Sequence, residues 1–129
     1  MKKVLVLLAV LLAMVCTGVY AADKEFKGYL SDVLCGSSGK DPAGDNLIKD
    51  PGKHTLACMK AEACAASGYG MFIKDKGGIY AFHKFDAKGS DMAKKEVVDT
   101  SKKKDNIKIK VKGDLQPDGT MMVKSMKAM

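Results

Sequence analysis

Four side chains in the middle of the chain are of types that bind metals or exchange electrons. They are the thiols of Cys35, Cys58 and Cys64 and the imidazole of His54. Three soft sulfur ligands and one imidazole would complete a tetrahedral Cys3His site suited to zinc or cuprous copper. These four residues are therefore the candidate metal ligands.

The spacing of the same residues also favours a disulfide. On one continuous helix, His54 and Cys58 are four residues apart and share a face. Cys58 and Cys64 are six apart, about 600° around the axis, and point to different sides. Because two of three thiols normally pair in an oxidising compartment, we expect Cys35 to bond with either Cys58 or Cys64. The sequence leaves open which of the two it is, and what the third cysteine does.

Sequence motifs for catalysis are missing. The chain has no CxxC for thiol exchange, no CxxCH for haem attachment, and no GxGxxG or Walker motif for phosphates. His54 and Cys58 could form a nucleophilic pair, but no oxyanion loop or third orienting residue accompanies them. We therefore expect that the protein is not an enzyme.

Two further groups of residues have chemistry to consider. Met121, Met122 and Met126 could bind cuprous copper, but such methionines usually fill a core. His83 lies between Phe82 and Phe85, and we expect a surface or core histidine there rather than a ligand.

The start of the chain reads as a secretory signal peptide. Lys2 and Lys3 precede an uncharged apolar run, and small residues lead up to Ala21, which is the pattern of a cleavable signal. The alternatives are a retained membrane helix, for which the run is short, and a lipoprotein anchored through Cys16, for which the preceding residues are too bulky. We expect cleavage after Ala21, a periplasmic or secreted protein, and no membrane span after cleavage.

Residues 22–129 are expected to form one domain, since they suffice for one core and not for two. Alternating or turn-bounded segments predict five strands, and alanine-rich residues closed by Gly68 predict a helix over 54–67. A bulge or bend is expected at Gly28, and a loop with one short helix over residues 86–104. The predicted strands cover residues 25–32, 69–75, 79–83, 106–113 and 121–126.

These elements predict a mainly β fold with one or two short helices, an α+β class. The connections are too short for the crossovers of a parallel sheet. A small five-stranded antiparallel barrel of the OB type, partly open, fits the element order best.

The charge pattern argues against one class of partner. The formal net charge is +7, and every basic residue is lysine, with no arginine in the chain. Arginine makes the bidentate contacts of sequence-specific nucleic-acid recognition. We therefore expect no such partner, and a small ligand or an envelope protein instead.

Several motifs together resemble a group of small exported bacterial proteins with OB-like barrels. The group combines an opening of the form G-x-hydrophobic-S-D-x-x-C-G, here residues 28–36, with a His/Cys-rich helix, here His54, Cys58 and Cys64, and a V-x-V-x-G type closing hairpin, here Ile109 to Gly113. Its members commonly space the helix cysteines four apart rather than six. The resemblance implies an exported OB-like barrel and implies no particular activity.

Three functions follow, in order of preference. The first is a non-enzymatic exported binding or structural module, stabilised by the disulfide and without a cofactor. The second is a periplasmic protein that binds or carries zinc or copper through Cys35, His54, Cys58 and Cys64. The third is a thiol-reactive enzyme using Cys58 or Cys64.

Overall fold

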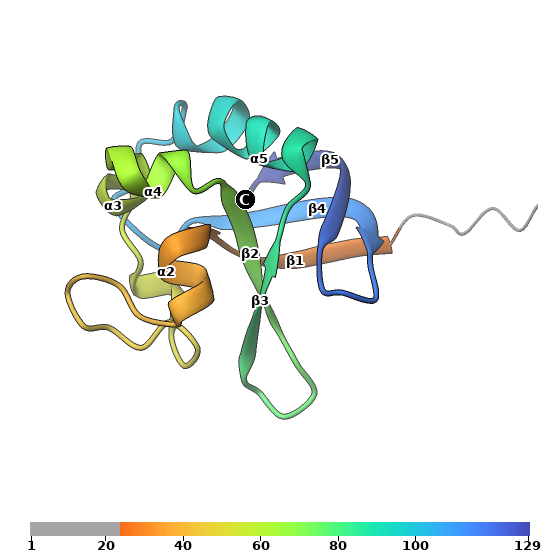
Figure 1. The fold of residues 1–129 in the computed structure, drawn as a ribbon, viewed down its shortest axis with the longest axis horizontal. Coiled ribbons are helices and arrows are strands. Elements are labelled where there is room, and N and C mark those ends of the chain that lie inside the picture. Colours follow the sequence, from red (N-terminus) through yellow and green to blue (C-terminus); the bar gives the residue numbers. More distant parts are fainter. Residues whose placement is uncertain (1–23) are drawn as a thin grey trace, which may run out of the picture.

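One five-stranded antiparallel sheet forms the frame of the protein (Figure 1). The computed structural model describes residues 24–129, so the predicted signal peptide, residues 1–21, lies outside the described residues. The strand order is β3-β2-β1-β4-β5, and every neighbouring pair is antiparallel. The strands are β1 (Lys24–Asp32), β2 (Tyr69–Lys74), β3 (Tyr80–Lys84), β4 (Lys108–Leu115) and β5 (Met121–Ala128). The predicted α+β class and the five strands are confirmed.

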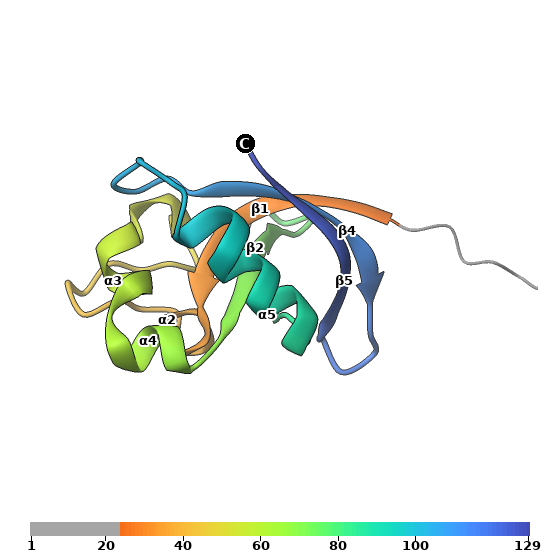
Figure 2. The ribbon, with the colours of Figure 1, turned by 90° about the horizontal axis from the view of Figure 1, so that it is seen from above.

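Short helices occupy the connections between the strands, and there are more of them than the one or two expected. They are α2 (Val33–Ser38), α3 (Leu56–Lys60), α4 (Glu62–Ala66) and α5 (Ala87–Ala93), with a 3-10 turn η1 (Pro51–Lys53) and a π-helical turn η2 (Lys94–Val98). Seen from above, α3, α4 and α5 lie on one side of β1 and β4 (Figure 2). Within residues 24–129, no helix has both the length and the apolar character that crossing a membrane requires.

The main core lies between these helices and the sheet. Ile109 and Val111 of β4 are fully buried, while the lysines between and beside them point to the other face. Met59 of α3 and Val97 of η2 pack against the same cluster. The strand predicted over residues 106–113 is confirmed, and one of its faces is buried. Each apolar side chain of this size contributes about 1.5–3 kcal/mol to stability when it leaves water.

A second, smaller core lies beside α2 and contains all three described cysteines. Its buried members are Cys35, Leu47, Cys64 and Phe72, and its partly buried members are Tyr29, Cys58, Tyr80 and Phe82. Gly36 is required here, because a Cβ at this position would overlap the Phe82 ring. The sequence alone does not separate this cluster from the main core.

The predicted OB-like barrel is not confirmed. The edge strands β3 and β5 do not pair, and one isolated bridge joins Phe85, which follows β3, to Met121 of β5. They form no ladder with each other, so the sheet stays open. Within the described residues, the outer edges of β3 and β5 have no neighbouring strand in the sheet. The architecture is therefore an open, curved sheet covered by helices.

The predicted bulge at Gly28 is not found either. Strand β1 pairs with β4 without interruption through Gly28, which lies opposite Ile109. The register shift lies between Lys112 and Gly113, where β4 pairs with β5. Gly28 has a different role, since a Cβ there would overlap the carbonyl of Phe72 on β2.

A glycine with positive φ lies in the turn of each of two hairpins. Gly78, between β2 and β3, has a φ of +82°, and Gly119, between β4 and β5, has a φ of +90°. Such values favour glycine. The segment after β3 is more helical than expected, because the Asp86 carboxylate accepts the Gly89 N–H at 3.0 Å and starts α5, which continues into η2.

Candidate metal centre

Cys35 is positioned by the turn that ends β1. Asp32, the last residue of β1, caps helix α2, and its Oδ2 accepts the backbone N–H of Cys35 at 3.0 Å. This is the usual arrangement of an N-cap, in which the side chain satisfies a free N–H of the first turn. It fixes the carboxylate of Asp32 and the thiol of Cys35 on the same side of the turn. Asp32 is fully buried and Cys35 is 6% exposed.

Cys58 and Cys64 are brought together by a break in the predicted helix. The segment 54–67 is not one helix: α3 ends at Lys60, and Ala61 has an extended ψ of 140° before α4 begins. This break cancels the 600° separation that a continuous helix would impose. The sulfurs of Cys58 and Cys64 are 3.9 Å apart. The prediction that these two thiols point to different sides is wrong.

The three sulfurs form one contiguous group around Cys58. The Sγ of Cys58 is 3.8 Å from that of Cys35 as well as 3.9 Å from that of Cys64. A disulfide requires about 2.05 Å, and all three cysteines are free. The predicted disulfide of Cys35 with Cys58 or Cys64 is therefore not found among the described residues.

The fourth donor of the group is Asp32. A carboxylate oxygen of Asp32 and the three cysteine sulfurs all lie within 4.8 Å of one another. Around a tetrahedral zinc ion with Zn–S bonds of about 2.3 Å, two sulfurs are separated by about 3.8 Å. The two short sulfur–sulfur distances equal this edge. The arrangement could hold a tetrahedral ion as a Cys3Asp set.

His54 lies behind Asp32 and is not one of the four donors. Its Nε2 is 2.6 Å from Oδ1 of Asp32, and both side chains are fully buried. Its Nδ1 faces Oδ2 of Asp41 at 3.9 Å and has no hydrogen-bond partner in the described part of the chain. The sequence-based ligand set named His54 where the structure places Asp32. As a hydrogen-bond partner of a candidate ligand, His54 would orient the carboxylate.

The local backbone explains why His54 reaches this position. Pro51 opens the turn η1, and the N–H of His54 returns to the Pro51 carbonyl at 3.3 Å. The next residue, Thr55, caps α3 by accepting the Cys58 N–H at 3.2 Å. One short segment therefore supplies both the histidine that faces Asp32 and the helix that carries Cys58.

The surroundings lower the pKa of Asp32 and raise the pKa values of two of the thiols. Burial disfavours the ionised form of Asp32, but hydrogen bonds from His54 and the Cys35 N–H outweigh it and hold the pKa of Asp32 below its ordinary value. Burial, followed by the nearby Asp32 charge, raises the pKa of Cys35 and raises that of Cys64 to about 11. Raised pKa values favour the protonated thiols. A bound divalent cation favours the thiolates instead, because it attracts their negative charge directly.

The other residues considered from the sequence do not join a donor cluster. Met121 is fully buried and Met126 is 9% exposed, both in the main core, whereas Met122 is 43% exposed. The expected core filling is confirmed for Met121 and Met126 and is wrong for Met122. His83 is partly buried, with Nδ1 3.0 Å from the Gly119 carbonyl oxygen.

Comparisons of the chain with protein-family models, with curated proteins and with solved structures found no match. The described residues form an open α+β sheet with a cluster of three cysteines and one buried aspartate.

Asp32 carried a signal that the sequence reasoning did not use. It lies three residues before Cys35, the spacing of an N-cap and the N–H it satisfies. An aspartate capping a helix that carries a cysteine in its first turn places a carboxylate beside a thiol.

Proposed function

We propose that the protein is an exported, non-enzymatic metal-binding protein that holds one zinc ion with Asp32, Cys35, Cys58 and Cys64. The observation that carries the proposal is the convergence of four donor atoms within 4.8 Å, with sulfur–sulfur distances of 3.8 and 3.9 Å. Cysteine and aspartate are both established zinc ligands, and four of them complete its tetrahedral shell.

The carboxylate supports zinc over cuprous copper. Cuprous copper prefers soft thiolate and thioether ligands, whereas zinc accepts thiolate, imidazole and carboxylate together. A site built only for copper gains little from a buried aspartate. The three methionines of β5, two of which lie in the main core, are separate from the sulfur cluster.

The number of donors supports binding rather than catalysis. Catalytic zinc sites use three protein ligands and keep the fourth position for water or substrate, whereas four protein ligands close the shell. Asp32 and Cys35 are buried, whereas Cys58 is partly buried. Partial exposure of a ligand would allow the ion to enter and leave. Export by the predicted signal peptide is part of the proposal.

The test is intact mass, native and denaturing, of protein recovered from the cell envelope, with free thiols counted on the same sample. We expect a chain that begins after Ala21 and carries one zinc ion, which leaves on denaturation and exposes three reduced thiols. A chain two mass units lighter, with one free thiol and no metal, would overturn the proposal in favour of a disulfide-stabilised module.

Cys58→Ser is the variant of choice, because Cys58 alone contacts both other sulfurs. We expect this variant to lose bound zinc. Ala57→Ser is the matched control, since Ala57 is the exposed neighbour on the same helix, and it should retain one equivalent. Equal metal content in the two variants contradicts the assignment.

A further inference from the structure

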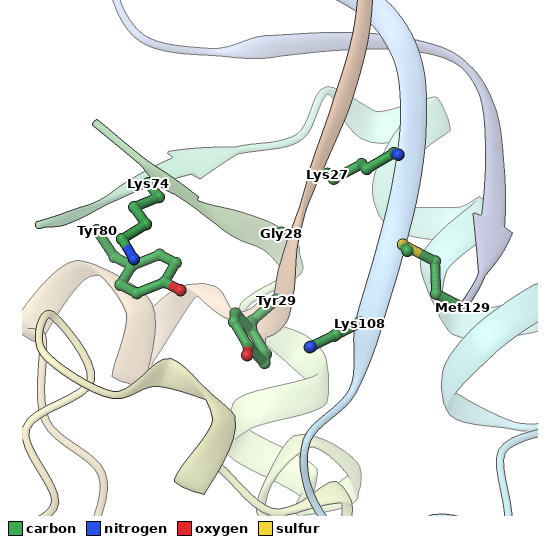
Figure 3. Close-up of a pocket in the computed structure, with 7 residues that line it drawn as sticks. All are labelled: Lys27, Gly28, Tyr29, Lys74, Tyr80, Lys108 and Met129. Carbon is green, nitrogen blue, oxygen red and sulfur yellow. The ribbon is translucent and has the colours of Figure 1, made fainter. Parts of the chain in front are cut away.

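A hollow on the sheet face away from α5 gathers lysines and tyrosines from four adjacent strands, β3, β2, β1 and β4 (Figure 3). Its lining residues are Lys27, Gly28, Tyr29, Lys74, Tyr80, Lys108 and Met129, named below the tyrosine–lysine hollow. Tyr29 of β1 lies directly opposite Lys108 of β4, and Lys74 of β2 lies directly opposite Tyr80 of β3. Opposed residues on neighbouring strands share a face, so the register itself creates this grouping.

The two tyrosine rings form a fixed wall of the hollow. Their centroids are 5.7 Å apart, with an interplanar angle of 77°. Both rings also pack against the small core that holds the cysteines. Edge-to-face packing is a favoured arrangement of aromatic pairs. The wall is present in the structure without a ligand.

Each ring positions one ammonium group. The Nζ of Lys108 lies 5.4 Å from the centroid of Tyr29, and that of Lys74 lies 5.8 Å from the centroid of Tyr80. These distances are those of cation–π contacts. Two of the three lysines are thus directed to the rings at the hollow instead of extending freely into water, as the close-up shows.

The positive charge of the hollow is not neutralised within residues 24–129. None of Lys27, Lys74 and Lys108 forms an ion pair with a carboxylate there. By contrast Lys110, on the same face of β4, pairs with Glu25 at 3.8 Å. Gathering like charges on adjacent strands is unfavourable, and an anion among them would relieve the repulsion.

The size of the hollow limits what can fill it. Its volume is about 260 Å³, which is slightly below the range of drug-sized ligand pockets. Burial and the neighbouring Tyr29 raise the pKa of Tyr80, so its hydroxyl stays protonated and available as a donor at neutral pH. Three ammonium groups and the phenol donors surround a small space. They could form charge-assisted hydrogen bonds with several anionic oxygens of one small molecule.

We propose that the tyrosine–lysine hollow binds a small molecule that carries two or more oxyanion groups, either phosphates or carboxylates. Lys27, Lys74 and Lys108 hold the anionic groups, and the rings of Tyr29 and Tyr80 shape the space between them. The hollow shares no residue with the four metal donors, so the proposal does not rest on zinc binding.

The experiment is a titration of the processed protein, followed by the backbone amide resonances of Tyr29, Tyr80 and Lys108 in NMR spectra. The probes are inorganic phosphate, pyrophosphate and citrate, at constant ionic strength because screening weakens exposed charge interactions. We expect saturable shifts confined to the hollow, with pyrophosphate or citrate bound at least about tenfold more tightly than phosphate. The preferred one of the two identifies phosphate or carboxylate as the group recognised.

The matched variants are Lys108→Gln and Lys88→Gln. Both remove one exposed positive charge, but Lys88 lies on α5, away from the hollow. We expect the first to weaken binding about tenfold or more and the second to change it less than about twofold. Equal weakening in the two variants, shifts spread over the whole surface, or saturation only by long polyanions would each overturn the proposal.

Discussion

Asp32 makes a side-chain hydrogen bond through each of its two carboxylate oxygens. One carboxylate oxygen accepts the Cys35 N–H and the other meets Nε2 of His54. A buried carboxylate is costly unless it is hydrogen-bonded, and here both oxygens have partners. The same two contacts orient the group toward Cys58 and Cys64. The aspartate thus starts a helix and completes the donor set.

His54 should act on the metal through Asp32. Replacing it with glutamine removes the imidazole that fixes the carboxylate, and loss of such an outer contact typically lowers metal affinity about 10–100-fold. We expect His54→Gln to bind one zinc ion still, with affinity reduced by that factor, in competition with a chromophoric chelator. His83→Gln, at the other histidine, should leave affinity unchanged. Unaltered affinity in His54→Gln would mean that the imidazole does not support the site.

Zinc binding should release protons. The pKa of Cys35 is raised and that of Cys64 lies at about 11, so both thiols are protonated at neutral pH without metal. Coordination requires thiolates, and each of these two cysteines therefore loses one proton on binding. Affinity should fall as the pH is lowered. Calorimetry in buffers of different ionisation enthalpy measures the number released, and Cys64→Ser should release one fewer. The same number in both proteins contradicts direct ligation by Cys64.

At the scale of elements, regular segments could be predicted and the points where they break could not. The alternation around Ile109 predicted β4, and Gly68, with its φ of +85°, ends the helical segment as expected. The extended backbone at Ala61 was missed, because alanine is a good helix former and local propensity gives no sign of a break. The convergence of Cys58 with Cys64 depends on that one residue.

The close packing of α5 on β5 should make an alanine in this helix destabilising, although helix propensity alone would predict the opposite. Alanine is ordinarily favoured over glycine inside a helix. A Cβ at Gly89, however, would lie 2.5 Å from Cγ2 of Val123 and 2.8 Å from Oδ1 of Asp86, the cap of the same helix. We expect Gly89→Ala to lower the free energy of unfolding by about 1–3 kcal/mol, measured by chemical denaturation. Lys88→Ala, exposed on the same helix, should be neutral, and a stabilised Gly89→Ala would show that α5 can move away.

For the molecule as a whole, the candidate centre brings together residues from segments that the sheet does not connect to one another. Asp32 and Cys35 follow β1, while Cys58 and Cys64 lie on α3 and α4 before β2. The loop over residues 39–50 between them contributes one fully buried side chain, Leu47. An ion held by both ends would restrain this loop in the way that a crosslink does.

Zinc should therefore raise the stability of the whole domain. A ligand that binds only the folded state stabilises it by about 2.7 kcal/mol when its concentration is 100 times the dissociation constant. We expect a higher midpoint of thermal unfolding with zinc and a return to the starting value after chelation. In the variant with serine at Cys35, Cys58 and Cys64, added zinc should leave the midpoint unchanged. Magnesium is the matched ion control, because it prefers octahedral oxygen ligands to thiolates. If zinc stabilises the serine variant as much as the natural chain, the ion acts elsewhere on the protein and the four donors do not hold it.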